Sequence, residues 1–297
     1  SPKGLPLRLM TNHVRAWQWK VLMMLSDVSE DTANRGRTII LADVGNSMVK
    51  LAVLKDVRQG MPCLEDRYDL NSHDFNCERF EDWLMTVAPV SAEFYVASVY
   101  ETAAASLETS ISTISATRNL SVRKQRILFS HLPIEVTTEH PEHVGIDRLA
   151  AATAASRLAI PSRGAIVIDC GTAVSVDLVS PDGQFLGGAI FPGPALLSRL
   201  LADGTSLLPE VLSLGEALPA MPGRSTNSAI VAGIGFGLRG AVCRLVDEAR
   251  RKIDAEVDVF LTGGWRGAVR GEDLSVQEFS DLVLSGIGIA AIEISGL

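Results

Sequence analysis

Two stretches of this chain decide its fold: Ile39-Ile40-Leu41-Ala42-Asp43-Val44-Gly45-Asn46-Ser47 and Ile166-Val167-Ile168-Asp169-Cys170-Gly171-Thr172. Each runs an apolar strand into Asp-x-Gly and then a small amide or hydroxyl residue, and a second apolar stretch follows at once. Such a hairpin is typical of phosphate handling, because the glycine lets backbone N–H groups approach an anion and the Asp can hold a cation. Two of them, a domain's length apart, indicate a duplicated nucleotide-binding architecture.

The composition sets the broad class of the protein. The chain has 297 residues, 47% of them hydrophobic, which is enough to fill the cores of two domains. Its net charge of −8, from 27 basic and 35 acidic residues without a basic block, argues against nucleic acid or an anionic membrane as main partner. No apolar run is predicted to approach the ~20 residues that span a bilayer. Four cysteines without a CxxC pair favour a reducing cytoplasm.

The pattern of apolar residues predicts the same order of elements twice. Three strands are followed by alternating helices and strands from residue 38, and the order restarts at Gly164. An Asp-Gly turn at Asp182-Gly183 favours a hairpin in the second round. The predicted fold class is therefore α/β, with duplicated actin-like (ribonuclease-H-like) domains of mixed sheets flanked by helices. The predicted division is an N-terminal extension over residues 1–37 and domains over 38–152 and 153–297.

A carboxylate and a guanidinium stand side by side at Asp147-Arg148, where an Ala-rich helix is predicted to begin. The start of a helix offers free N–H groups and partial positive charge. One interpretation makes Asp147 a helix N-cap. The other makes Asp147 the general base on a substrate hydroxyl, with Arg148 binding substrate or neutralising phosphoryl charge.

Several other features have ordinary interpretations. The GxGxxG at Gly235–Gly240 lies inside a predicted helix and favours close helix packing over a dinucleotide site. The cluster His140-Pro141-Glu142-His143 is interrupted by proline, which favours a solvated loop over a metal site. Cys170 is predicted to be an apolar filler. Lys50 is a surface lysine, or a cation that reaches phosphate oxygens if it points back to the first turn.

Taken together, these residues resemble the type III pantothenate kinases of the acetate-and-sugar-kinase, Hsp70 and actin superfamily. The resemblance covers about Thr38 to the C-terminus and rests on six motifs in order. They are Asp43-Val44-Gly45-Asn46-Ser47, Gly145-Ile146-Asp147-Arg148, Asp169-Cys170-Gly171-Thr172, Gly187-Gly188-Ala189-Ile190-Phe191-Pro192-Gly193, Thr205-Ser206-Leu207-Leu208-Pro209 and Thr262-Gly263-Gly264.

The resemblance implies ATP-dependent phosphorylation of pantothenate to 4′-phosphopantothenate, the first step towards coenzyme A, by a cytoplasmic homodimer using ATP with Mg²⁺. It implies a monovalent cation, K⁺ or NH₄⁺, at Asp169, and a substrate pocket near the subunit interface. Asp147 would be the catalytic base. The residues implied to bind ATP are Asp43, Val44, Gly45, Asn46, Ser47, Met48, Val49, Lys50 and Thr172. Those implied to bind pantothenate are Gly145, Ile146, Asp147, Arg148 and Thr205.

Three positions depart from the family pattern or mark a subgroup. Ile146 stands where the family commonly has Ala, and Thr138 stands where many members carry a substrate-contacting tyrosine. Lys50 resembles the lysine that an accessory-factor subgroup often has at this place. Two other hypotheses stay open: a catalytically silent accessory protein of the same fold, and an actin-like-fold kinase or phosphatase for another small substrate. The intact Asp-x-Gly turns and the Asp147-Arg148 pair disfavour the accessory protein. The other actin-like families share the two hairpins but not Gly145-Ile146-Asp147-Arg148.

Overall fold

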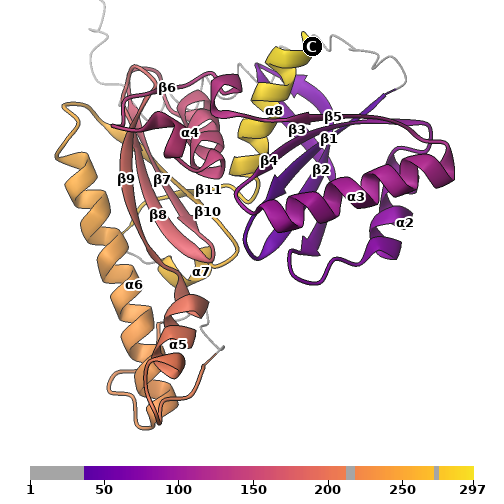
Figure 1. Cartoon of the computed structure of the whole chain (residues 1–297). Helices are drawn as coiled ribbons and strands as arrows, with labels where there is room; N and C mark the ends of the chain where they lie inside the picture. Colours follow the sequence, from indigo (N-terminus) through magenta and orange to yellow (C-terminus); the bar gives the residue numbers. More distant parts are fainter. Residues whose placement is uncertain (1–36, 212–217, 271–273) are drawn as a thin grey trace, which may run out of the picture. The chain divides into compact units, whose positions relative to one another are not determined.

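The first mixed sheet joins a three-strand antiparallel meander to two parallel strands (Figure 1). Its strands are β1 (Thr38–Val44), β2 (Met48–Arg58), β3 (Met61–Asn71), β4 (Ser91–Ser98) and β5 (Ser121–Arg126), in the order β3-β2-β1-β4-β5. β1 pairs with β2 antiparallel and with β4 parallel, and β5 continues the parallel half. This computed structural model describes residues 37–211, 218–270 and 274–297, so the predicted extension lies, except for Arg37, outside the described residues.

The second sheet repeats this plan. Its strands are β6 (Glu135–Val136), β7 (Gly164–Cys170), β8 (Ala173–Val179), β9 (Gln184–Pro192), β10 (Val257–Thr262) and β11 (Gln277–Glu278), in the order β11-β10-β7-β8-β9-β6. β7, β8 and β9 form the meander, while β10 runs parallel to β7 and β11 parallel to β10. The short β6 adds an edge strand beside β9. The predicted α/β duplication with two mixed sheets is confirmed.

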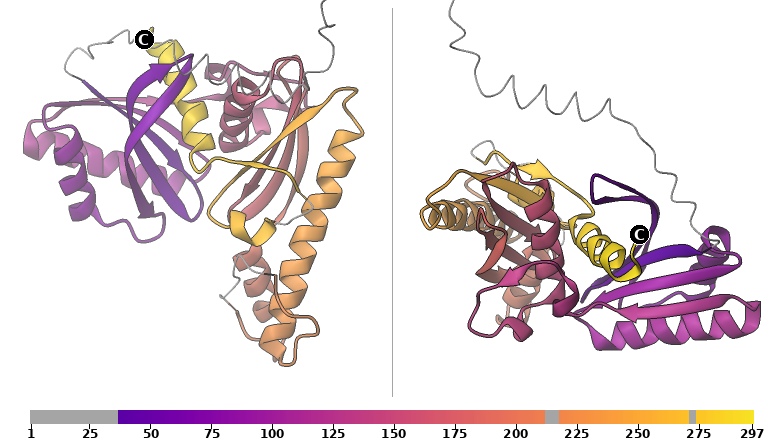
Figure 2. Two further views of the ribbon diagram at one scale, coloured as in Figure 1. Left: turned by 180° about the vertical axis from the view of Figure 1, so that it is seen from behind. Right: turned by 90° about the horizontal axis from the view of Figure 1, so that it is seen from above.

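Helices cover both faces of the two sheets (Figures 1 and 2). They are α2 (Cys77–Val87), α3 (Glu101–Arg118), α4 (Ile146–Leu158), α5 (Pro194–Asp203), α6 (Thr226–Arg250), α7 (Arg266–Val269) and α8 (Leu282–Ser295), with the 3-10 helices η1 (Phe129–His131) and η2 (Pro141–His143). Helices α2 and α3 bury the outer face of the first sheet, and α6 buries that of the second. Helices α4 and α8 share a core with the inner faces of both sheets.

Because side chains alternate along a strand, Asp43 and Asp169 both lie on the inner faces of their sheets, which the shared core covers. In β1, Ile40, Ala42 and Val44 face α2 and α3, so Asp43 faces the opposite side with Leu41. In β7, Ile166, Ile168 and Cys170 face α6, and Asp169 therefore shares the inner face with Val167. The two carboxylates thus occupy equivalent places in the two sheets.

Helices α4 and α8 approach each other closely where Gly286 meets Ala150. A Cβ added at Gly286 would lie 1.9 Å from the carbonyl oxygen of Ala150, so only glycine fits there. The predicted domain boundary at residue 152 falls inside α4, and the division into two domains stays a prediction.

The structure differs from the sequence-based predictions in two respects. The strands β5, β6 and β11 and the short helix α7 are absent from the predicted elements, because their sequences are polar or very short. The prediction that no apolar run approaches membrane-spanning length is wrong for α6, whose 25 residues pass the test of length and hydropathy. Buried α6 residues such as Ile230, Leu238 and Val242 pack on the second sheet, as in a core helix.

Candidate active site

The first glycine turn is held in shape by hydrogen bonds. Gly45 N–H donates to the carbonyl of Met48 at 3.0 Å, which closes the turn between β1 and β2. Ser72, just after β3, supports it: its hydroxyl donates to Gly45 O at 2.7 Å and its N–H to Ser47 O at 3.0 Å. Asn46 and Ser47 are exposed at the tip, so their donors can meet a ligand.

Lys50 lies between two carboxylates of the first sheet. It is the register partner of Asp43 on β1 and of Asp69 on β3. Opposite residues of neighbouring strands share a face of the sheet, so Asp43, Lys50 and Asp69 form one row. Of the two interpretations of Lys50, the strand register therefore favours the cation near the first turn over the surface lysine.

The second glycine turn is built in the same way. Gly171 N–H donates to Ala173 O at 2.9 Å, and Gly193 N–H donates to Thr172 O at 2.9 Å. The loop after β10 approaches this turn at Gly263, whose φ is +94°. A Cβ at Gly263 would lie 2.3 Å from Cys170 O and 2.5 Å from Asp169 Oδ1, so a side chain there would displace the turn.

The two turns meet through their hydroxyls. Ser47 Oγ and Thr172 Oγ1 lie 2.7 Å apart, within hydrogen-bond distance, although 125 residues separate them in the sequence. Both side chains belong to exposed residues at the tips of their turns. One anion can therefore be reached from both turns.

Helix α4 begins with Gly145 as its N-cap and Asp147 in its first turn. Asp147 Oδ1 accepts a hydrogen bond from the N–H of Arg148 at 2.8 Å. A Cβ at Gly145 would lie 2.5 Å from that oxygen, so a side chain there would displace the Asp147 carboxylate. Because Gly145 holds the N-cap position, the interpretation of Asp147 as the N-cap is wrong.

Arg148 is paired with Asp177, a residue that the sequence reasoning missed. Its Nε donates to both carboxylate oxygens of Asp177 at 3.1 Å, and its Nη2 forms an ion pair with Oδ1. Ser175 donates to Oδ2 of Asp177 at 3.0 Å, and the Arg148 guanidinium lies 5.5 Å from the centroid of the Phe185 ring. The side chain of Asp177 is 1% exposed, so this pair is fixed in the protein interior.

The carboxylates of the two turns and of α4 act on one another electrostatically. Burial raises the pKa of Asp43 to about 7, Lys50 opposes the rise, and the charges of Asp147 and Asp169 add to it. Burial likewise raises the pKa of Asp169 to about 6, again with Lys50 opposing. Burial also raises the pKa of Asp147 and Asp177. Carboxylates so placed favour a cation among them.

A sequence model of type III pantothenate kinases matches residues 39–248. The chain belongs to this family. A type III pantothenate kinase of Halorhodospira halophila is 42% identical over 129 residues, 43% of this chain and 49% of that one. One from Alkalilimnicola ehrlichii is 43% identical over 153 residues, 50% of this chain and 59% of its own length. The chain thus spans about half the length of these curated relatives. The predicted resemblance is confirmed.

Solved structures agree on the fold. A Campylobacter jejuni protein named for the Baf family of transcriptional activators is 20% identical, with a TM-score of 0.53, covering 87% of this chain and 100% of that one. A Sinorhizobium meliloti protein named as a 2-dehydro-3-deoxygalactonokinase is 16% identical, with a TM-score of 0.52, over 87% and 97%. At these identities the likeness concerns the fold alone.

Thr138, a departure from the family pattern, and Thr205, a predicted pantothenate-site residue, both have special positions. Thr138, at the place of the family tyrosine, has a buried Oγ1 without a hydrogen-bond partner among the described residues. It lies beside Gly187 on β9, where an added Cβ would be 3.5 Å from its methyl carbon. Thr205 follows α5 and uses its hydroxyl locally, donating to Leu201 O at 2.7 Å. Figure 1 shows α5 below the second sheet and α4 beside it.

The sequence contains a pattern that could have predicted Asp177 as a site residue, although the strand around it is apolar. Ser175 and Asp177 are two residues apart in β8, so both side chains point to the same face of a buried strand. Gly188 opposite leaves room for the carboxylate, since a Cβ there would lie 2.4 Å from Asp177 Oδ1. A polar pair on one face of an apolar strand, facing glycine, predicts a polar site.

Two further predictions about this family member can be compared with its structure. Burial raises the pKa of Cys170 to about 12, as for an inert apolar filler. The GxGxxG motif lies within α6, as predicted, and not at a strand-to-helix turn. The predicted close packing is wrong at Gly237 and Gly240, where an added Cβ meets no atom within 4 Å, whereas at Gly235 it would lie 2.9 Å from Pro219.

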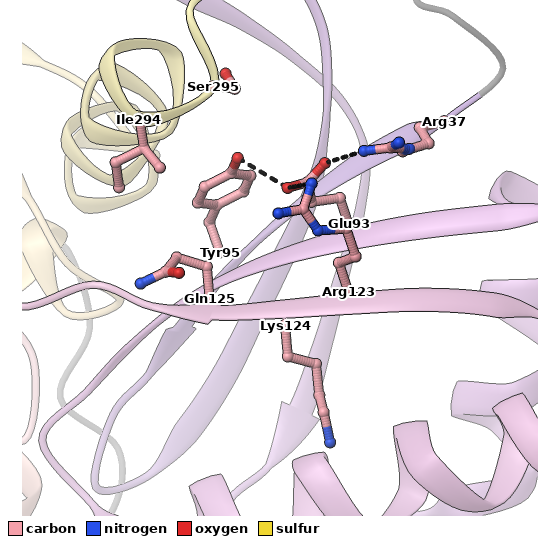
Figure 3. A pocket seen from close by; sticks show the side chains of 8 residues that line it. All are labelled: Arg37, Glu93, Tyr95, Arg123, Lys124, Gln125, Ile294 and Ser295. Atoms are coloured by element: carbon pink, nitrogen blue, oxygen red, sulfur yellow. Dashed lines mark hydrogen bonds and ion pairs between the residues drawn. The ribbon is translucent and has the colours of Figure 1, made fainter.

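A separate polar hollow lies over β4 and β5, beside the end of α8 (Figure 3). Figure 3 shows Arg37 and Arg123 directed at the carboxylate of Glu93, with distances of 3.3 and 3.6 Å, and the Tyr95 hydroxyl donating to it at 3.2 Å. Lys124 points away from this group and donates to Ser112 on α3. The arginines offset the charge of one buried carboxylate, which is a structural role.

Proposed function

We propose that the chain carries out ATP-dependent phosphorylation of pantothenate to 4′-phosphopantothenate, the first step of coenzyme A biosynthesis. The observation that carries the proposal is the meeting of the Ser47 and Thr172 turns beside Asp43, Asp147 and Asp169. Membership of the family and the identity with its curated members support the same activity.

The two turns supply the donors that a triphosphate needs. N–H groups and hydroxyls at Asn46, Ser47 and Thr172 are exposed at the tips, and Lys50 offers a positive charge in the same row as Asp43. A preorganised set of donors stabilises the charge of a transferring phosphoryl group without reorganisation. Val44, Met48 and Val49 belong to this segment and hold it in the sheet.

The acidic residues fit the cations that this chemistry uses. Mg²⁺ takes oxygen ligands and neutralises phosphate charge, and Asp43 is placed to hold it directly or through water. Asp169 would hold the monovalent cation, K⁺ or NH₄⁺, from the second sheet. Burial is the main cause of the raised pKa of both carboxyls, and the charge of Asp147 adds to it in each, which supports a cation bound among these groups.

Asp147 would take the proton of the acceptor hydroxyl. Its Oδ1 is used by the Arg148 N–H, so Oδ2 is the oxygen for this task. The raised pKa of Asp147, caused by burial, brings its proton affinity closer to that of a base working near neutrality. Such a base contributes about 10²- to 10⁴-fold to the rate.

Arg148 would recognise the carboxylate of pantothenate. Asp177 pairs with Nε and Nη2 of Arg148, and Nη1 is the remaining edge of the guanidinium. A guanidinium held in one orientation loses little entropy when it binds a second carboxylate. Gly145 and Ile146 would line this pocket, and the unpartnered Thr138 hydroxyl would face it in place of the family tyrosine.

The active form would be a cytoplasmic homodimer with a substrate pocket near its interface. Between α5 and α6 lies an apolar hollow of about 580 Å³. A Cβ added at Gly233, Gly237 or Gly240 of α6 meets no atom within 4 Å, and Leu207 beside this region is 92% exposed. A second copy packed here would cover these groups and bring Thr205 to the partner's site. Light scattering should give a dimer for the wild type and a monomer for Gly237→Glu, with Thr109→Glu on α3 as control.

The test is ADP release in a coupled assay with and without pantothenate. We expect release to depend on pantothenate and to fall when Na⁺ replaces K⁺ at constant ionic strength. ADP release that no acceptor stimulates would support the silent accessory protein. Stimulation only by another alcohol or acid would support a kinase for another substrate.

A further inference from the structure

The segment before α4 gathers two imidazoles and a carboxylate by a route that the sequence did not predict. A proline disfavours the interior of an α-helix, but Pro141 begins the 3-10 helix η2, with His140 as the N-cap. A 3-10 helix has three residues per turn, so side chains at i and i+3 eclipse each other. His140 and His143 therefore lie on one side, with ring centroids 5.4 Å apart and planes tilted by 36°.

The three side chains have the spacing of metal ligands. Glu142 Oε1 lies 3.7 Å from His140 Nδ1 and 3.8 Å from His143 Nε2, and the ligand atoms of all three lie within 4.8 Å of one another. A tetrahedral Zn²⁺ with bonds near 2.1 Å needs ligand atoms about 3.4 Å apart. All three residues are exposed, so small side-chain rotations close the difference without moving the core.

We propose that His140, Glu142 and His143 form a binding site for a first-row divalent cation of the Zn²⁺ type. Imidazole nitrogens suit Zn²⁺, Ni²⁺ and Cu²⁺, whereas Mg²⁺ prefers oxygen ligands, so this site differs in chemistry from the Asp43 and Asp169 carboxylates. Three protein ligands leave the fourth position of a tetrahedral ion open to water. The proposal does not depend on the kinase activity.

The position of the site gives the bound ion a structural consequence. The helix η2 is held by single backbone bonds, His143 N–H to His140 O at 3.1 Å and Val144 N–H to Pro141 O at 3.2 Å. Gly145, the N-cap of α4, follows directly. An ion bridging His140 and His143 adds a cross-link over the same turn, so amide exchange in residues 140–145 slows when it binds.

The test is a Co²⁺ titration of the full chain, freed of metal with a chelator and followed by ligand-field absorption. We expect one Co²⁺ per chain, displaced by Zn²⁺, and slower amide exchange in residues 140–145. The double variant His140→Ala/His143→Ala should lose the absorption. Loss of even an outer-shell partner costs about 10- to 100-fold in metal affinity, so Glu142→Gln should weaken binding by at least roughly tenfold.

Matched variants separate this site from others. Glu139→Gln removes an exposed carboxylate of the same segment, and His73→Ala removes an exposed imidazole from another region; both should bind Co²⁺ like the wild type. Unchanged thermal midpoints show that the variants fold. Equal binding by wild type and double variant, or no binding by the wild type, overturns the proposal. Binding lost on Cys77→Ser assigns the ion to a thiol and also overturns it.

Discussion

Ser47 Oγ and Thr172 Oγ1 lie 2.7 Å apart and join two glycine turns that belong to different sheets. Each hydroxyl follows an Asp-x-Gly motif that ends an equivalent central strand, β1 or β7. The duplicated fold thus brings two copies of one local structure to the same place. A phosphate chain bound there would be contacted by both copies.

The Ser47–Thr172 contact gives the first prediction. Ser47→Ala and Thr172→Val should each raise the KM for ATP by roughly fivefold, the value of a hydrogen bond of about 1 kcal/mol. If the hydroxyls act as a pair, the double variant should lose less binding free energy for ATP than the sum of the losses in the two single variants. Steady-state kinetics check this, with Thr113→Ala on the exposed side of α3 as control. Strict additivity would contradict a shared role.

Asp147→Asn should lower kcat by about 10²- to 10⁴-fold with little change in the KM for ATP, because the amide cannot accept the proton. The matched control is Asp182→Asn, which changes an exposed carboxylate in the β8–β9 turn. Wild-type turnover by Asp147→Asn would remove the assignment of the base.

Asp177→Asn should change the KM for pantothenate without changing the KM for ATP. Arg148 would lose its charged partner, so the KM for pantothenate should rise while that for ATP stays within twofold or so. Breaking a buried pair also destabilises the fold, by about 3 kcal/mol. Ser175→Ala, which removes one hydrogen bond to Asp177, is the milder variant and should shift the pantothenate KM in the same direction. Equal changes in both KM values would favour a merely structural role.

Two helix glycines with different surroundings lead to opposite predictions for stability. Gly286→Ala forces a Cβ against the Ala150 carbonyl and should destabilise the protein by about 2 to 3 kcal/mol. Gly240→Ala, in α6 with open space around it, should stabilise by about 0.5 to 1 kcal/mol, since alanine favours the helix. Urea denaturation at low protein concentration compares the two, and an equal effect would contradict the close contact.

The raised pKa of Asp43 predicts the pH dependence of stability. Its pKa rises from 3.8 to about 7 on folding, so the folded chain binds the proton more tightly than the unfolded chain. Stability should therefore fall as pH rises from about 4 to about 7. Asp43→Asn removes this loss and should stabilise the ligand-free protein above pH 7, by up to about 4 kcal/mol. Thermal unfolding without divalent ions checks it, and a lower midpoint than that of Asp182→Asn would refute it.

The sequence predicts the central strands and their acidic ends because each strand is apolar, short and followed by a glycine turn. The alternation of side chains along β1 and β7 then places Asp43 and Asp169 on the inner faces. Local patterns of this kind carry their own geometry, and so the two turns could be predicted from the residues alone.

The missed features depend on packing between distant segments. β5 has the sequence Ser-Val-Arg-Lys-Gln-Arg, and only its pairing with β4 makes it a strand. Asp177 becomes part of the site because Arg148, 29 residues earlier, turns towards it. The His140–His143 cluster depends on a 3-10 turn, while the proline predicts only the end of an α-helix.

The contact of Gly286 with Ala150 also bears on the candidate site. A Cβ at Gly286 would clash with the Ala150 carbonyl, so helices α4 and α8 approach each other at backbone distance here. Asp147 lies in the first turn of α4, and its position therefore depends on how α4 packs on α8. A larger residue at position 286 would push the two helices apart, and the Asp147 carboxylate would move with α4.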